Sequence, residues 1–173
     1  WGRDLYGESR LVALIEEICA HTQIPWIRLL YCYPDKITDE LVQAFRTNPR
    51  LLPYIDLPVQ HLSDRILRAM HRKGDSEVIR DAVHRLRTVK GMVIRSTFIT
   101  GFPGETEEDV QILLRGAQAL RFDRLGVFPY SREEGTPAYD MPDQVDEQVK
   151  QDRADLVMGE QLLRCEEENQ TLV

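Results

Sequence analysis

Six polar or charged side chains are predicted to lie on one face of a set of β-strands. They are Arg28, Asp56, Gln60, Arg95, Thr97 and Tyr130. Side chains alternate between the two faces of a strand, and the other face of these strands is mainly apolar, as packing against helices requires. Charged groups destabilise a protein interior unless they are paired or used. We therefore predict that this face lines a cavity for a polar ligand; the alternative is a buried structural ion cluster of Arg28, Asp56 and Arg95.

A glycine-rich turn, 101–105 (GFPGE), follows a strand predicted over Val93–Thr100. The next segment predicts a helix over Glu107–Leu120, with Thr106 as its N-cap and acidic residues in its first turn. Ligands of α/β folds bind at the carboxyl ends of strands, where this turn lies. A phosphate-binding loop is not expected, because no lysine follows Gly104 and acids occupy the helix start. The alternative is that the glycines only make a tight turn.

Strands and helices alternate along the chain. The other predicted strands are Trp26–Tyr33, Tyr54–Gln60 and Arg124–Tyr130. The other predicted helices are one capped by Ser9 and ending near Thr22, one over Asp39–Arg46 capped by Thr38, one from Ser63 to Arg72, one over Ser76–Val89, and one over Gln144–Gln170. This alternation indicates parallel strands with right-handed crossovers, in a doubly wound sheet or in part of a barrel.

The composition is that of a globular domain, with 173 residues, 42% of them hydrophobic and 29% charged. The net charge of −7 argues against binding of a nucleic-acid backbone by this segment. The sequence has neither a long apolar run nor a signal-peptide pattern. Three widely spaced cysteines, Cys19, Cys32 and Cys165, indicate a reducing compartment rather than a disulfide framework. No histidine pair has metal-ligand spacing and no nucleophile elbow is present, so no metal ligand or catalytic side chain is predicted.

Three stretches carry a family resemblance: Leu57–Asp64 (LPVQHLSD), Ser96–Asp109 (STFITGFPGETEED) and Phe122–Tyr139 (FDRLGVFPYSREEGTPAY). In this order they resemble the methylthiotransferase branch of the radical S-adenosylmethionine (SAM) enzymes. The resemblance implies an α/β fold, a partial six-stranded (β/α) barrel with a parallel sheet. Residues 1–143 would supply its last four strand–helix units, without the first two strands, and 144–173 would form a linker or strap helix. The chain is accordingly expected to be a piece of a longer protein.

Two stretches favour one substrate within this branch. Trp26–Leu41 and Tyr54–His61 resemble the enzymes that add a methylthio group to an aspartate of ribosomal protein S12, in the small ribosomal subunit. The tRNA-modifying enzymes usually carry a Ser- and His-containing stretch in place of Tyr31–Pro34, and Gln-Ser-Gly-Ser in place of Gln60–Ser63. The acidic net charge agrees with a basic protein substrate. The alternatives are a tRNA adenosine methylthiotransferase and a non-catalytic half-barrel that binds a nucleoside or a ribosomal partner.

The resemblance also implies the cofactors, which are SAM and [4Fe-4S] clusters in the intact enzyme. The Cys-x-x-x-Cys-x-x-Cys motif that holds a cluster in the family is not in this sequence, so the segment alone is expected to be inactive. In the family a reduced cluster splits SAM, the resulting radical takes hydrogen from the substrate carbon, and a methylated sulfur is joined there. No side chain of this segment then needs to act as a general acid or base.

Residue by residue, the resemblance implies one set of contacts to SAM and another to the substrate. Gln60, Ser63, Arg95 and Thr97 are candidates for the polar groups of SAM. Its adenine and methionine would lie near Ile99, Gly101, Phe102, Pro103, Gly104, Phe128 and Tyr130. Substrate-side candidates are Arg28, Asp56 and His61. The expected location is the cytoplasm, without a membrane partner.

Overall fold

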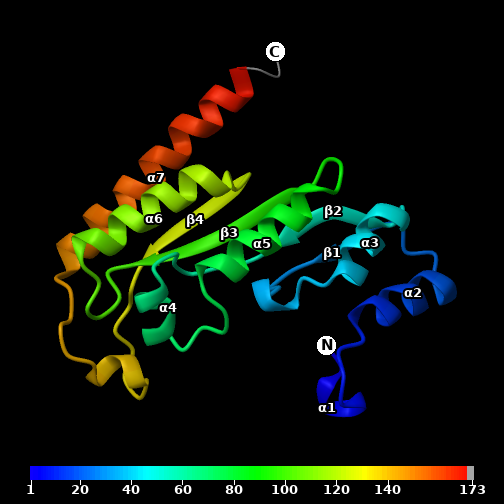
Figure 1. Cartoon of the computed structure of the whole chain (residues 1–173), viewed down its shortest axis with the longest axis horizontal. Coiled ribbons are helices and arrows are strands. Elements are labelled where there is room, and N and C mark those ends of the chain that lie inside the picture. Colours follow the sequence, from blue (N-terminus) through cyan, green and yellow to red (C-terminus); the bar gives the residue numbers. More distant parts are fainter. Residues whose placement is uncertain (171–173) are drawn as a thin grey trace.

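A four-stranded parallel sheet organises the fold, in the order β1-β2-β3-β4 (Figure 1). The computed structural model describes residues 1–170, apart from the side chains of 167–169. The strands are β1 (Ile27–Leu29), β2 (Leu51–Asp56), β3 (Val93–Thr100) and β4 (Arg124–Pro129). Strand order follows chain order, with helices in the crossovers, so β1 and β4 are the two edges of an open sheet. The predicted parallel α/β architecture is confirmed.

Helices fill the crossovers and continue beyond the last strand. They are α1 (Arg3–Tyr6), α2 (Leu11–His21), α3 (Asp39–Thr47), α4 (Asp64–Ala69), α5 (Ser76–Arg87), α6 (Glu107–Leu120) and α7 (Glu147–Gln170), with short 3₁₀ turns η1 (Pro34–Lys36) and η2 (Pro137–Asp140). Figure 1 shows α7 running beside α6, and it packs against β4 and β3 as well. No described helix has the length and apolar character needed to cross a membrane.

The hydrophobic core lies between the sheet and the helices. Ile55, Ile94 and Phe98, which the alternation predicts on the helix side, are fully buried. Phe98 meets Phe122 edge to face, with ring centroids 5.8 Å apart. Along β3 the opposite face is open or half-open, because Arg95 is exposed between buried neighbours. One face of the sheet is therefore covered by helices, and the other is accessible, as in a barrel that lacks strands.

The boundaries around the central turn agree with the prediction. Both Val93–Thr100 and Glu107–Leu120 begin and end at the predicted residues. The hydroxyl of Thr106 accepts a hydrogen bond from the backbone of Asp109, whose carboxylate accepts one from the backbone of Thr106, at 2.8 Å. This capping box defines the first turn of α6. Thr38 caps α3 in the predicted way, accepting from Leu41 N.

Several predicted boundaries near the amino-terminal half are wrong. The first strand stops at Leu29, and Tyr31, expected against the helices, is 80% exposed with a left-handed φ of 57°. The second strand covers Leu51–Asp56 instead of Tyr54–Gln60. Ser9 does not cap α2, because Arg10 occupies the N-cap position without a side-chain hydrogen bond. Helix α4 stops at Ala69 because the chain reverses shortly afterwards.

Candidate functional site

A cavity of about 360 Å³ opens at the carboxyl ends of the strands. Four of the residues that line it were predicted as cofactor contacts: Gln60, Ile99, Phe102 and Tyr130. Its other walls come from the end of α4 (69–72) and from the segment around η2 (136–138 and Met141). Parallel α/β sheets place their ligands at this edge. The cavity is therefore the candidate binding site.

Gln60 carries its side chain into this cavity from a strained backbone. Its φ is 71°, in the left-handed region that non-glycine residues avoid. Two hydrogen bonds to β3 hold it there: Gln60 N donates to Thr97 O at 2.9 Å, and Ile99 N donates to Gln60 O at 2.8 Å. The side-chain oxygen Oε1 is buried and has no hydrogen-bond partner among the described residues. Strain that the surrounding structure enforces, together with an unpaired polar atom, is typical of a ligand site.

Tyr130 supplies a second unpaired polar atom from β4's end. Its ring packs edge to face on Phe102, at 5.2 Å between centroids. Its hydroxyl is buried and lacks a hydrogen-bond partner in the described part of the chain. Ile99 and Phe102 form apolar walls, and the lining residues Gln60 and Tyr130 each carry an unpartnered polar atom. This lining suits a ligand that has a flat apolar portion and a few polar groups. A nucleoside such as the adenosyl group of SAM has this chemistry, so the residues present fit it.

The turn 101–105 forms the wall beneath the cavity and is held from α7. Gly101 has a φ of 71°, and a Cβ atom there would lie 2.1 Å from Cγ of Lys150. Glu105 points inward, where Oε1 accepts hydrogen bonds from Gly101 N at 2.8 Å and from Nη1 of Arg153 at 2.9 Å. Glu105, Lys150 and Arg153 were not among the predicted site residues. Their positions in GFPGE and in a charge-rich helix gave no sign that they would be buried.

Two predicted contacts are turned away from the cavity. His61 has no exposed surface in this chain and does not line the cavity, and its contact with the substrate stays a prediction. Its Nδ1 accepts a hydrogen bond from Ser63 N at 2.9 Å. The hydroxyl of Ser63 donates to Oδ1 of Asp109 at 2.6 Å and is buried at the start of α4.

Asp109 gathers several hydrogen bonds behind the cavity wall. Burial alone raises the pKa of its carboxyl group, but hydrogen bonds from Ser63, Thr106 and Arg65 outweigh burial and lower the pKa to about 2. The carboxylate is thus ionised at neutral pH and ties the start of α4 to the start of α6. It is a structural partner of Ser63, not a member of the cavity lining.

The charged residues of the open sheet face lie further down the strands. Arg95 pairs in register with Asp56, and its Nε is 3.9 Å from Oδ1 of Asp56. Arg28 instead stacks on the ring of Tyr54, with 4.5 Å from guanidinium to centroid. Arg95 precedes Ile99 by four residues, about 13 Å along a strand, so these charges lie below the cavity. Of the three residues in the predicted ion cluster, Asp56 and Arg95 therefore lie near each other, whereas Arg28 stacks on an aromatic ring instead.

The remaining predicted contacts lie around the cavity without lining it. Thr97 is half-buried and pairs in register with Gly126. It follows Arg95 by two residues on the same face of β3. Phe128 is 57% exposed on β4. Pro103 is buried, and Gly104 N donates to Asp143 O at 2.8 Å. These residues shape the turn and the open face, and their contacts to SAM stay predictions.

Cys32 lies beside Asp56 at the open face. Its backbone N donates to Asp56 O at 2.9 Å. Burial, and secondarily the negative charge of Asp56, raises the pKa of the Cys32 thiol to about 11. All three cysteines are free, and among the described residues no three His, Cys, Asp or Glu side chains come together as a metal site. The residues present therefore do not fit an iron–sulfur cluster.

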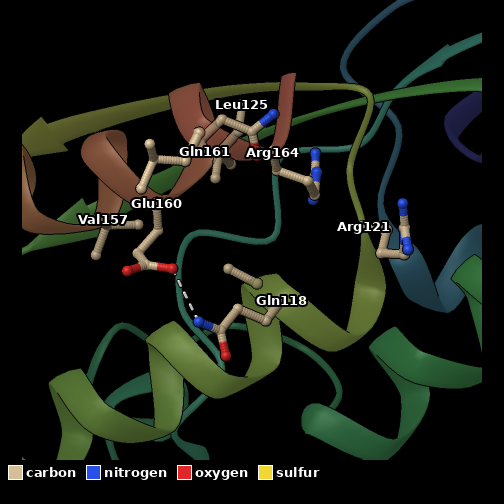
Figure 2. Close-up of a pocket in the computed structure, with 9 residues that line it drawn as sticks. Gln118, Arg121, Leu125, Val157, Glu160, Gln161 and Arg164 are labelled. Atoms are coloured by element: carbon tan, nitrogen blue, oxygen red, sulfur yellow. Dashed lines mark hydrogen bonds between the residues drawn. The ribbon is translucent and has the colours of Figure 1, made fainter. Parts of the chain in front are cut away.

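A second cavity, of about 320 Å³, lies between α6 and α7 (Figure 2). Figure 2 shows Gln118 of α6 facing Glu160 of α7, with a hydrogen bond of 2.9 Å between them. Leu125, at the amino-terminal end of β4, also lines this cavity. It is thus at the opposite end of the sheet from Gln60, away from the unpaired polar atoms.

Parallel strands with crossover helices and a ligand-sized cavity at the carboxyl edge define a partial (β/α) barrel. The chain matches the Radical SAM superfamily over residues 4–116 and belongs to that superfamily. Among solved structures it resembles coproporphyrinogen III oxidase (HemN) from Escherichia coli, with a TM-score of 0.64 and 21% identity over 78% of this chain and 31% of that one. The methyltransferase TsrM from Kitasatospora setae has a TM-score of 0.53, with 19% identity over 66% of this chain and 22% of that one. These likenesses show the fold, and the predicted family and fold class are confirmed.

Curated relatives carry a more specific similarity. The ribosomal protein uS12 methylthiotransferase RimO of Geobacter sulfurreducens is 49% identical over 174 residues, 100% of this chain and 39% of the relative. The protein of the same name from Syntrophus aciditrophicus is 47% identical over 100% of this chain and 38% of its own length. That of Desulforamulus reducens is 51% identical over 88% of this chain and 35% of its own length. The chain spans less than two fifths of the length of these relatives, and the predicted resemblance to ribosomal-protein methylthiotransferases is confirmed.

Proposed function

We propose that the complete protein is a radical SAM methylthiotransferase that modifies an aspartate of ribosomal protein uS12, and that this chain supplies the SAM cavity. The observation that carries the proposal is the 49% identity to a RimO over the whole chain. The structure supports it because Gln60, Ile99, Phe102 and Tyr130 line one cavity of suitable chemistry. The cluster ligands would come from chain outside these residues.

In this proposal the chain binds and orients the cofactor. SAM, when bound with a [4Fe-4S] cluster, supplies the radical chemistry. Gln60 Oε1 and the Tyr130 hydroxyl offer an acceptor and a donor to its polar groups, and Ile99 and Phe102 pack against its apolar portion and exclude water. Arg95, Thr97 and Phe128 would add contacts to SAM from the open sheet face, where the substrate-side candidates Arg28 and Asp56 also lie.

The stretch Tyr31–Pro34 forms a rim that touches one wall of this cavity without lining it, and Tyr31 and Tyr33 line a separate cavity beside α3. The guanidinium of Arg72, which lines the cavity, stacks on the Tyr33 ring at 4.8 Å from its centroid. Tyr31, next to it, is 80% exposed with its backbone held left-handed. Exposed aromatic side chains are favoured at protein interfaces. We propose that this rim contacts the substrate protein and contributes to the choice of protein over tRNA.

The proposed partner is ribosomal protein uS12, free or in the small ribosomal subunit, which places the enzyme in the cytoplasm. The net charge of −7 favours a basic protein partner. It disfavours contact of this segment with the phosphate backbone of RNA.

The proposal is tested on the complete protein with its cluster ligands, reconstituted with iron and sulfide. SAM, a reductant and either uS12 or tRNA are added, and mass spectrometry follows a methylthio group on each. A modified aspartate is expected. A modified adenosine would assign the tRNA activity instead, and no modification of either would favour a non-catalytic half-barrel.

Two variants test the rim separately. Tyr31→Ala is expected to raise the KM for uS12 several-fold while SAM affinity stays constant. The matched control is Trp26→Ala, since Trp26 is an equally exposed aromatic residue at the opposite end of β1. Equal effects of the two variants would argue against a substrate rim at Tyr31.

A further inference from the structure

A buried charged contact joins α7 to the turn under the cavity. Arg153 of α7 donates through Nη1 to Oε1 of Glu105 at 2.9 Å and to the Glu105 backbone oxygen at 3.2 Å. The Glu105 side chain has no exposed surface, and that of Arg153 is 14% exposed. Removing either partner would leave an uncompensated buried charge. Helix α7 is thus fixed to the turn by more than apolar packing.

The same carboxylate reaches a second element of the site. Oε1 of Glu105 also holds the backbone N–H of Gly101, at 2.8 Å. Oε2 lies 3.2 Å from Nε2 of His61, and both side chains are fully buried. Because Nδ1 of His61 accepts from Ser63 N, a ring proton is carried on Nε2, which lies against Glu105 Oε2 without the geometry of a hydrogen bond. One carboxylate therefore contacts the turn after β3, the turn after β2 and α7.

His61 is directly bonded to the residue that enters the cavity. Gln60 is held left-handed between two hydrogen bonds to β3, and the backbone N of His61 donates to Val59 O at 2.9 Å. The buried His61 ring joins this turn to the turn 101–105 through Glu105, and Arg65 of α4 makes a second connection by donating through Nη2 to Gly104 O at 2.8 Å. Moving the ring would release the backbone that aims Gln60 Oε1.

We propose that Arg153, Glu105 and His61 form a positioning unit, through which α7 sets the backbone at Gln60 and Gly101 and so the affinity of the cavity for its adenosyl ligand. The choice of ligand rests on the proposed function; the mechanical coupling does not. The three residues touch no ligand and are positioning residues. The competing explanation is that they stabilise the fold without influencing Gln60.

The test uses the complete protein and the variant Arg153→Met, which keeps an unbranched side chain in place of the arginine stem and removes the charged guanidinium. Arg153→Lys is the conservative variant. The matched control is Gln151→Met, because Gln151 is exposed on the same helix and bonds only to Asp155. Isothermal titration with S-adenosylhomocysteine gives affinity, and hydrogen–deuterium exchange reports on residues 58–63 and 100–105 separately.

Arg153→Met is expected to weaken S-adenosylhomocysteine binding about tenfold and to speed exchange in both segments, including 58–63, which Arg153 does not touch. Arg153→Lys should recover part of the affinity, and Gln151→Met should change neither readout. Faster exchange with unchanged affinity, or exchange confined to 100–105, would overturn the proposal.

A second variant covers the case in which Arg153→Met does not fold. Glu105→Gln keeps an acceptor for Gly101 N and removes the charge that faces His61; the same two effects are expected, and their absence would overturn the proposal. If the unaltered protein does not bind S-adenosylhomocysteine, the proposed function fails. The exchange in 58–63 then still decides the coupling.

Discussion

The side chain of Lys150 occupies the space that a Cβ atom would need at Gly101, since that atom would lie 2.1 Å from Cγ and 3.1 Å from Cα of Lys150. Lys150 is 1% exposed, and its backbone oxygen accepts a hydrogen bond from the Thr100 hydroxyl at 3.1 Å. Glycine at this position therefore does two things. It permits the left-handed turn after β3, and it lets α7 approach the turn closely.

Gly101→Ala is expected to lower the free energy of unfolding by roughly 2–4 kcal/mol, because left-handed strain and overpacking against Lys150 add together. Urea unfolding followed by circular dichroism measures it. The control is Gly91→Ala, since Gly91 has a similar φ of 73° and no heavy atom within 4 Å of the added Cβ. That variant should lose only about 1 kcal/mol. Equal losses would show that the contact with Lys150 has no energetic consequence.

Asp109→Asn is expected to destabilise the protein by about 1–2 kcal/mol at pH 7, because it weakens the charge-assisted hydrogen bonds from Ser63, Thr106 and Arg65. The native pKa of Asp109, about 2, lies below its ordinary value of 3.8. Because the carboxylate is favoured in the folded protein, the stability that it contributes is fully present above its ordinary pKa of 3.8. This stability is lost as the pH falls from about 4 toward the folded-state pKa of about 2. The variant should therefore show a flatter stability profile in that range, measured by urea unfolding at several pH values.

Asp155→Asn is the control for this measurement, because Asp155 is exposed and accepts one hydrogen bond from Gln151. It should leave the stability at pH 7 and the acid profile nearly unchanged. An Asp109→Asn profile parallel to that of the unaltered protein would mean that other carboxylates dominate acid unfolding.

Cys32 is expected to react slowly with iodoacetamide at pH 8. A pKa of about 11 instead of 9.0 lowers its thiolate fraction about 100-fold, and the thiolate is the reactive form. The negative charge of Asp56 is the second cause of the raised pKa, after burial. Asp56→Asn removes this charge, so it should speed alkylation of Cys32 several-fold. Mass spectrometry of the modified peptides gives the rate, with the urea-unfolded chain as reference. An unchanged rate in Asp56→Asn would assign the slow reaction to burial alone.

The central fold could be predicted where local signals agree. Val93–Thr100 and Glu107–Leu120 were predicted to the residue, because alternation, glycine and an N-cap act within a few positions of the chain. The strand Leu51–Asp56 was misplaced, because apolar residues continue through 57–59 and only pairing with β3 shows where the ladder ends. Strand ends of this kind depend on tertiary register rather than on local preference.

The site could be predicted in part for the same reason. Period-two alternation brings Ile99 and Tyr130 to the open face, and the cavity contains both. His61 and Ser63 were predicted as contacts from the resemblance and not from the alternation, and both are buried, as is Val59 before them. The role of α7 was missed because its buried face, Lys150, Ala154, Val157 and Gln161, includes two polar residues, whereas Leu156, Leu162 and Leu163 are exposed. Charge and hydropathy alone therefore do not indicate which face of this helix is buried.

Tyr130→Phe is expected to stabilise the ligand-free protein and to weaken ligand binding. The Tyr130 hydroxyl is buried without a hydrogen-bond partner in the described residues, so removing it relieves an unsatisfied group and adds about 1 kcal/mol of stability. If the hydroxyl bonds to SAM, the same change removes one hydrogen bond and lowers affinity about 3–10-fold.

Urea unfolding and titration with S-adenosylhomocysteine measure the two effects on the complete protein. Tyr54→Phe, at the lower part of the open face, should change neither quantity. A gain in stability without a loss of affinity would contradict a hydrogen bond between the ligand and the Tyr130 hydroxyl. The ligand would then bind elsewhere than against Tyr130, and the unpaired hydroxyl would have no role in binding.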